Sequence, residues 1–93
     1  MTKINCKLST LLKARSSVAE SLENRISDCR ERIVYLRDRS SERVNEIKAE
    51  NPDASTDEID ALIKDDWRIE NNASEIDLEN AEIGVLEDLL ASI

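Results

Sequence analysis

Apolar residues recur along the chain with helical spacing, in two stretches separated by one break. In the first stretch they lie mostly three or four positions apart, which places them on one face of an α-helix. These positions are Leu11, Val18, Leu22, Ile26, Cys29, Ile33, Leu36, Val44 and Ile47. In the second stretch the apolar positions recur about every seven residues. They are Leu62, Ile69, Ile76, Ile83 and Leu90, flanked by Ile59 and Ala73. The pattern predicts two long amphipathic helices.

A single cluster of turn-forming residues separates the two stretches. Pro52 disfavours helix at the residue before it, and the neighbouring Asn, Asp and Ser residues are typical of turns. Directly afterwards Ser55 is placed to cap a new helix, with Glu58 three residues later. At the other end of the chain, Ser9 or Thr10 is placed to cap the first helix.

These signals predict a first helix over about 9–50, a turn over 51–55 and a second helix over about 56–92. The segment 71–74 (Asn-Asn-Ala-Ser) is a weak point of the second helix. Because it contains neither Pro nor Gly, we expect the helix to continue through it. The expected fold is an all-α, antiparallel, coiled-coil-like hairpin of two helices, forming one domain over 1–93.

The apolar positions of the two helices match when the chain doubles back at the turn. The expected apolar pairs are Val44 with Leu62, Leu36 with Ile69, Ile33 with Ala73, Cys29 with Ile76, and Leu22 with Ile83. Ser40 falls opposite Asp66, whereas Asn80 opposite Ile26 is a mismatch. This register predicts three ion pairs, Arg39 with Asp66, Arg30 with Glu75, and Lys48 with Asp57.

The distribution of charge supports the same arrangement. The chain has 93 residues, 37% of them charged, with one Gly, one Pro and a net charge of −8. Residues 1–49 hold 11 basic and 7 acidic side chains, whereas residues 50–93 hold 2 basic and 14 acidic ones. A basic helix folded onto an acidic one disfavours the parallel arrangement, although each exposed ion pair contributes only about 0–1 kcal/mol.

The second helix has further apolar residues on its outward side. Its candidate partner-binding residues are Ile63, Trp67, Leu78, Ala81, Val85 and Leu89. An apolar row on the outside of a thin hairpin is typical of an interface with another chain. We expect a homodimer, formed as an antiparallel four-helix bundle, or a protein partner on this side.

Acidic residues flank this row and are expected to steer a basic partner. The candidate steering residues are Asp65, Asp66, Glu70, Glu75, Asp77, Glu79, Glu82 and Asp88. In a symmetric dimer these carboxylates would repel their copies unless the first helix of the second subunit meets them. That repulsion also favours a basic partner.

The composition argues against several classes of function. The chain has no His, its two cysteines are far apart along the chain, and it has no Gly-rich phosphate loop. We therefore expect no enzyme, no cofactor and no metal site. Residues 1–10 lack the apolar run of a signal peptide, and no stretch is apolar enough for a membrane span. The sequence predicts a soluble, cytoplasmic protein.

Three functions are compatible with this pattern. The first is a protein-interaction module: an adaptor, assembly factor or small inhibitor. The alternative is an acidic mimic of DNA, of the kind phages encode, which blocks a DNA-binding or defence enzyme through Asp65, Asp66, Glu70, Glu75, Asp77 and Glu79. A structural subunit of a helical assembly is a third possibility. Direct nucleic-acid binding is not expected, because acids interleave the arginines of the first helix and the pI is near 4.5.

Overall fold

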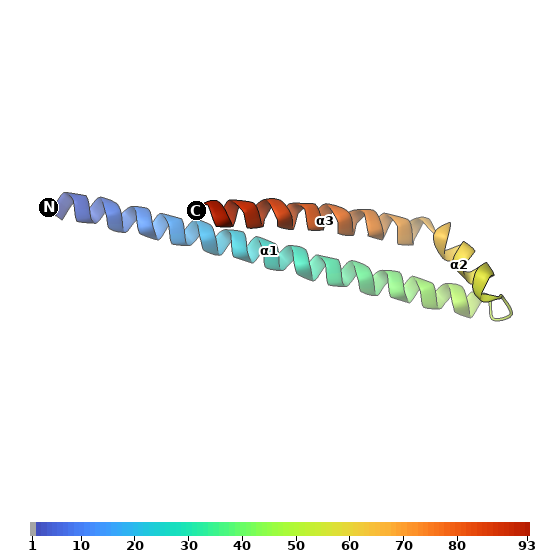
Figure 1. The fold of residues 1–93 in the computed structure, drawn as a ribbon. Helices are drawn as coiled ribbons and strands as arrows, with labels where there is room; N and C mark the ends of the chain where they lie inside the picture. The colour runs from blue at the N-terminus through green and yellow to red at the C-terminus, as the bar shows by residue number, and fades with distance from the viewer. Residues whose placement is uncertain (1) are drawn as a thin grey trace.

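The structure is a computed structural model that describes the backbone of residues 2–93 and the side chains of residues 7–93. It contains three helices, α1 (Thr2–Glu50), α2 (Thr56–Lys64) and α3 (Trp67–Ser92). α1 and α3 lie side by side and run in opposite directions, while α2 lies obliquely between the turn and α3 (Figure 1). Together they form a rod of 80 × 17 × 15 Å. The prediction of an all-helical chain is confirmed for residues 2–93.

α1 begins earlier than the sequence predicted. It starts at Thr2 rather than near Ser9, and Ser9 and Thr10 lie inside the helix. Residues 2–8 contain no Pro or Gly, so nothing in this segment ends the helix before its predicted cap. With 49 residues at 1.5 Å each, α1 is about 74 Å long.

The turn over 51–55 forms where Pro52 and its polar neighbours predicted it. The Asn51 amide nitrogen donates to the carbonyl of Ile47 at 3.1 Å, and the Asn51 side chain donates to the same carbonyl at 2.9 Å. Ser55 is the N-cap of α2, and its hydroxyl accepts a hydrogen bond from the Glu58 amide at 3.2 Å. The predicted N-cap is confirmed, and Ser55 satisfies one of the free amides at the start of α2.

The second half of the chain is not one helix, and the prediction of a continuous helix over 56–92 is wrong. The break lies at Asp65 and Asp66, whereas the weak point at 71–74 stays helical. Asp66 has an extended backbone, with φ −77° and ψ 113°, and its carboxylate accepts hydrogen bonds from the amides of Arg68 and Ile69. An aspartate that caps a new helix in this way ends the preceding one.

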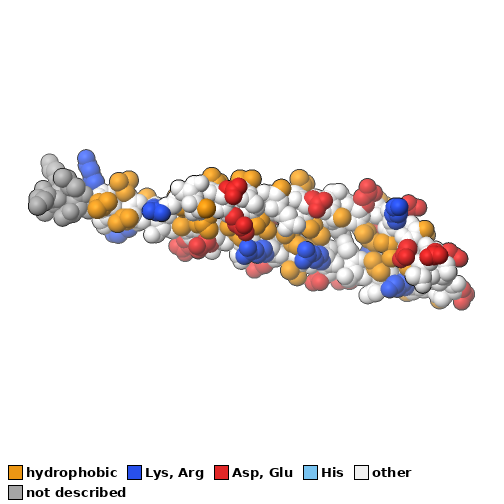
Figure 2. Space-filling view, in the orientation of Figure 1, with side chains coloured by type: hydrophobic (Ala, Val, Ile, Leu, Met, Phe, Trp, Pro, Cys, Tyr) orange, Lys and Arg blue, Asp and Glu red, His pale blue; other side chains and the backbone are white. Residues whose placement is uncertain are grey.

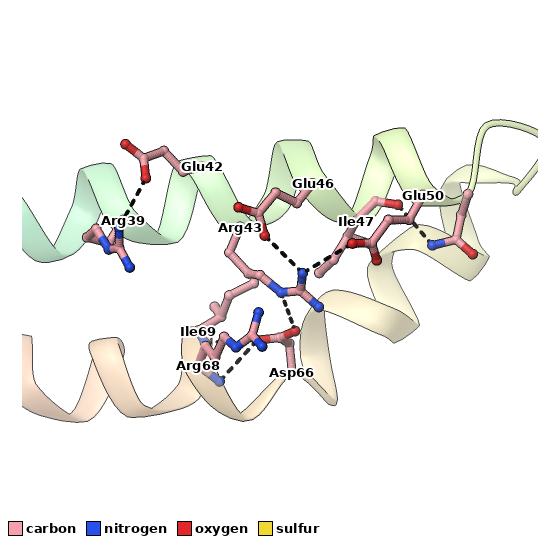
Figure 3. A network of polar contacts seen from close by, with 10 residues as sticks. Arg39, Glu42, Arg43, Glu46, Ile47, Glu50, Asp66, Arg68 and Ile69 are labelled. Carbon is pink, nitrogen blue, oxygen red and sulfur yellow. Dashed lines mark hydrogen bonds and ion pairs between the residues drawn. The ribbon is translucent and has the colours of Figure 1, made fainter.

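Arg43 of α1 holds this break in place (Figure 3). Its guanidinium lies 2.8 Å from the Asp66 carboxylate, 3.0 Å from Glu46 and 3.7 Å from Glu50. The side chain of Asp66 is only 9% exposed. The hydrogen bond from Arg43 lowers the pKa of Asp66, and the same contact raises the pKa of Arg43. The predicted pair of Arg39 with Asp66 is wrong.

The register of α3 on α1 differs from the prediction in one consistent direction. Arg39 pairs with Glu42, and Glu75 pairs with Arg32 rather than with Arg30. Ser40, expected opposite Asp66, accepts a hydrogen bond from the Asn72 side chain at 3.1 Å. In the contacts of Glu75 and Asn72, the α3 residue lies nearer the turn than predicted. The cause is α2, which runs obliquely and so advances less along α1 per residue than an aligned helix would.

The two remaining ion-pair predictions are also wrong. Arg30 reaches Glu87, at 3.2 Å, instead of Glu75. Among the residues whose side chains are described, no ion pair joins Lys48 to Asp57.

The core is a single seam between α1 and the other two helices. Its buried residues are Ile26, Cys29, Ile33, Leu36, Ile47 and Ile59. α3 contributes only half-buried residues to this seam, because two thin helices touch along one line and neither encloses the other. Leu62, predicted in the seam, is 43% exposed, and Ile59 is buried instead because α2 is a separate, differently oriented helix.

The first part of α1 has no helix packed against it. Every residue from 7 to 18 is exposed, and Ala19 is the first half-buried one. α3 ends part of the way along α1, so the N-terminal portion of α1 projects beyond it (Figure 1). Leu11 and Val18 were predicted in the core, but they are 67% and 49% exposed. We call residues 7–18 the N-terminal arm.

Candidate interaction surface

Four large apolar residues form a row on the side of α3 that does not contact α1. Trp67, Leu78, Val85 and Leu89 are 68%, 71%, 60% and 50% exposed. Their spacing places them on one face of the helix, away from the half-buried positions that face α1. We call these four residues the outward row. Hydrophobic side chains are also visible along the outer edge of α3 in Figure 2.

The other two residues predicted for this surface, Ala81 and Ile63, lie on different helices. Ala81 is exposed on α3, between Leu78 and Val85. Ile63 belongs to α2 and is half-buried, where it lines a hollow of about 350 Å³ with Val44 and Ile59. The structure therefore separates Ile63 from the outward row, because the helix break at Asp65 and Asp66 turns α2 away from α3.

Trp67 stands at the end of the row, beside the helix break. The guanidinium of Arg68 lies 5.6 Å from the centre of the Trp67 ring, within the range of a cation–π contact. Trp67 also lines a hollow of about 330 Å³ together with Arg39, Arg43 and Asn71. Exposed tryptophan and arginine side chains are the types that contribute most binding energy at protein interfaces.

The eight predicted acidic steering residues divide into two groups. Asp65, Glu70, Asp77 and Asp88 are exposed and make no ion pair with any described side chain. The other four are half-buried on the side that faces α1, and they are Asp66, Glu75, Glu79 and Glu82. Three of these four pair with arginines of α1, so they hold the two helices together.

Glu79 and Glu82 lie beside the buried thiol of Cys29. The Cys29 sulfur and the two carboxylates lie within 4.8 Å of one another. Burial, followed by hydrogen bonding to Glu79 and Glu82, raises the pKa of the Cys29 thiol to about 12. Arg25 donates to Glu82 at 2.8 Å, and this hydrogen bond lowers the pKa of Glu82.

This cluster is a poor metal site. A thiol that stays protonated near neutral pH is a weak metal ligand, and the Glu82 carboxylate is already occupied by Arg25. The packing of α3 on α1 explains the proximity of the three groups. The side chain of Cys6 lies outside the described residues, so the predicted separation of the two thiols stays a prediction.

The N-terminal arm is a second exposed apolar surface, and the sequence analysis did not identify it. Leu8, Leu11, Leu12 and Val18 are 56%, 67%, 55% and 49% exposed. Figure 2 shows hydrophobic and basic side chains together on this part of α1. The helical spacing of these residues is visible in the sequence, but it gave no sign that they would lie beyond the end of α3.

Both surfaces are long, narrow and apolar with charged flanks, which suits the binding of another helix. Across the residues that the structure describes, every helix is too short or too polar to cross a lipid bilayer. No family model matches the chain, and neither a curated protein nor a solved structure matches it.

Proposed function

We propose that this chain is a non-enzymatic protein-interaction module, built on an antiparallel helical hairpin, whose outward row is buried by another protein chain. One observation carries this proposal: four large apolar side chains, each at least half exposed, follow one face of a helix whose other face packs on α1. The exposed acids beside them, Glu70, Asp77 and Asp88, favour a basic partner surface.

The thinness of the fold supports this proposal. Only six residues among those described are buried, which is a small core for a chain of this length. Covering the four residues of the outward row contributes at most about 6–12 kcal/mol, at roughly 1.5–3 kcal/mol per large side chain. Association entropy offsets much of that gain, so the module binds reversibly.

A homodimer is the most economical way to cover the row. In the predicted four-helix bundle, two outward rows would meet face to face. Glu70, Asp77 and Asp88 would then lie near their own copies and repel them. A dimer in which α1 of the second copy covers the row avoids this repulsion, because α1 is rich in arginine and lysine.

The proposal is tested by replacing Trp67 with Ala and Val85 with Asp in one variant. We expect this variant to keep its helicity by circular dichroism and to lose self-association, measured by light scattering, or partner binding. The matched control carries Tyr35→Ala and Val34→Asp, on α1, where the wild-type side chains are 51% and 56% exposed. Unchanged mass and unchanged partner binding in the Trp67 and Val85 variant would refute the proposal.

The DNA-mimic alternative has less support from the contacts. Of its six carboxylates, Asp66 and Glu75 pair with arginines of α1, and Glu79 lies against Cys29. A phosphate mimic needs its carboxylates turned outward, as Asp65, Glu70 and Asp77 are. Salt separates the two functions, because a mimic loses its target steeply between about 50 and 200 mM salt, whereas an apolar interface does not.

A further inference from the structure

We propose that the N-terminal arm of one copy of this chain covers the part of the outward row from Leu78 to Leu89 on a second copy, reciprocally, across a two-fold axis. This inference rests on the proposed function, because it names the surface that buries the row. It adds a binding surface, residues 7–18, to the one on α3.

The arm continues the face of α1 that already binds α3. At 100° per residue, Leu8, Leu11 and Val18 fall on the same side of α1 as the buried residues Cys29 and Leu36. Further along α1, the acidic helix α3 packs against this face. The arm therefore presents the same kind of seam, without a helix of its own molecule on it.

The charges of the arm and the row are complementary. Residues 7–18 include Lys7, Lys13 and Arg15 and no acidic residue. The outward row is flanked by the exposed carboxylates of Asp77 and Asp88. The covered part of α1 shows how such surfaces meet, because its arginines pair there with glutamates of α3, as Arg25 does with Glu82 at 2.8 Å.

The arm also matches the part of the outward row from Leu78 to Leu89 in length and spacing. The arm positions Leu8, Leu11, Arg15 and Val18 are separated by three, four and three residues, and the α3 positions Leu78, Ala81, Val85 and Leu89 by three, four and four. The arm and the segment from Leu78 to Leu89 are each about 15–17 Å long at 1.5 Å per residue. Spacings of three and four residues are those of helices that pack side by side.

The two surfaces cannot meet within one molecule. The arm projects beyond the end of α3 (Figure 1), and Leu78, Val85 and Leu89 are exposed on α3 outside its half-buried face toward α1. A two-fold rotation about an axis near the C-terminal end of α3 generates the second copy. The two α3 helices then lie end to end. The arm of each copy runs parallel to the other copy's α3 and covers its segment from Leu78 to Leu89.

Two-fold symmetry doubles the area that this contact buries. One contact of about 15 Å is short for a specific interface, but the symmetry axis doubles it. The doubled contact brings the buried area toward the roughly 1,200 Å² at which specific interfaces begin. It also closes the assembly, because each arm and each segment from Leu78 to Leu89 is then covered.

The test compares Leu11→Asp in the arm, Val85→Asp in the row and Val34→Asp as the matched control, by sedimentation equilibrium of the 93-residue chain. We expect the wild type and the Val34 variant to dimerise, at twice 10.5 kDa. The Leu11 and Val85 variants should each show at least a tenfold higher dissociation constant. All variants should keep their helicity over α1 and α3 at matched concentration, because the replaced residues are exposed.

Mixing the two weakened variants gives a second readout. The mixed dimer retains one intact arm-on-row contact, so the mixture should associate more tightly than either variant alone. If the Leu11 variant dimerises like the wild type while the Val85 variant does not, the arm proposal is overturned and the proposed function stands. If neither substitution changes the mass, the arm proposal is overturned, and the proposed function fails as well when the Trp67 and Val85 variant also keeps its partner binding. Polymers that grow with concentration would overturn the closed two-fold arrangement.

Discussion

The covered and uncovered parts of α1 share one apolar stripe but have opposite environments. Leu36, in the covered part, is 2% exposed, whereas Leu11, in the N-terminal arm, is 67% exposed. Both belong to one apolar stripe flanked by basic residues. Helical periodicity therefore identifies which face of α1 is apolar. The length and path of the neighbouring helix decide how much of that apolar face is buried.

The largest effect expected from this comparison is on stability. Leu36→Ala removes a buried side chain and leaves a cavity, so it should lower the free energy of unfolding by about 2–5 kcal/mol. Leu11→Ala at a concentration where the chain is monomeric should change it by no more than about 0.5 kcal/mol. Urea unfolding followed by circular dichroism measures both. Equal losses would mean that the arm is covered within the monomer.

A smaller effect is expected where Arg43 of the covered part holds Asp66. Asp66→Asn keeps a capping side chain but removes the charge, so the variant should melt at a lower temperature than the wild type at pH 7. The folded pKa of Asp66 lies below its ordinary value of 3.8, so the unfolded chain takes up the proton first. The stabilisation is therefore complete above pH 3.8 and is lost as the pH falls through the folded pKa.

Thermal melting of both proteins between pH 7 and pH 2 checks this dependence. The difference in melting temperature should shrink at the acid end of the series. Asp38→Asn is the control, because Asp38 is exposed, lies outside both proposed surfaces and makes no ion pair with a described side chain, and its difference from the wild type should not follow this course. A difference for Asp66→Asn that stays constant with pH would contradict the assigned role of the ion pair.

The smallest effect on stability is expected from a substitution in α3, the helix that covers α1. Gly84 lies inside α3, and a Cβ atom added there meets no other atom within 4 Å. Gly84→Ala should therefore raise the free energy of unfolding by about 0.5–1 kcal/mol, because alanine loses less backbone entropy in a helix. Urea unfolding measures the gain. A loss of stability would show that this side of α3 is in contact with another chain.

Several features of the fold were predictable because they depend on neighbouring residues. Pro52 and its polar neighbours predicted the turn, and Ser55 predicted the start of α2. The helix break at Asp66 was missed, since an aspartate inside an apolar repeat is compatible with a continuous helix until Arg43, 23 positions earlier in the chain, is brought against it. Without that break the register of α3 could not be predicted correctly.

The candidate surface was predictable in part. The spacing of Trp67, Leu78, Val85 and Leu89 placed them together on one face, whereas Ile63 was assigned to the same face only because one continuous helix was assumed. Four of the eight acidic residues face α1 rather than solvent, which depends on the register. The N-terminal arm was missed because its leucines have the same pattern as core residues.

The sequence by itself determined that the chain is helical, where it turns, and which face of each helix is apolar, because these properties follow from residue types and from spacing along one helix. Only the tertiary structure decided which arginine pairs with which carboxylate, and how far along α1 its apolar face is covered by α3. Both depend on the path of α2, whose oblique course shifts α3 toward the turn. The spacing of residues along a single helix does not indicate the size of this shift of α3.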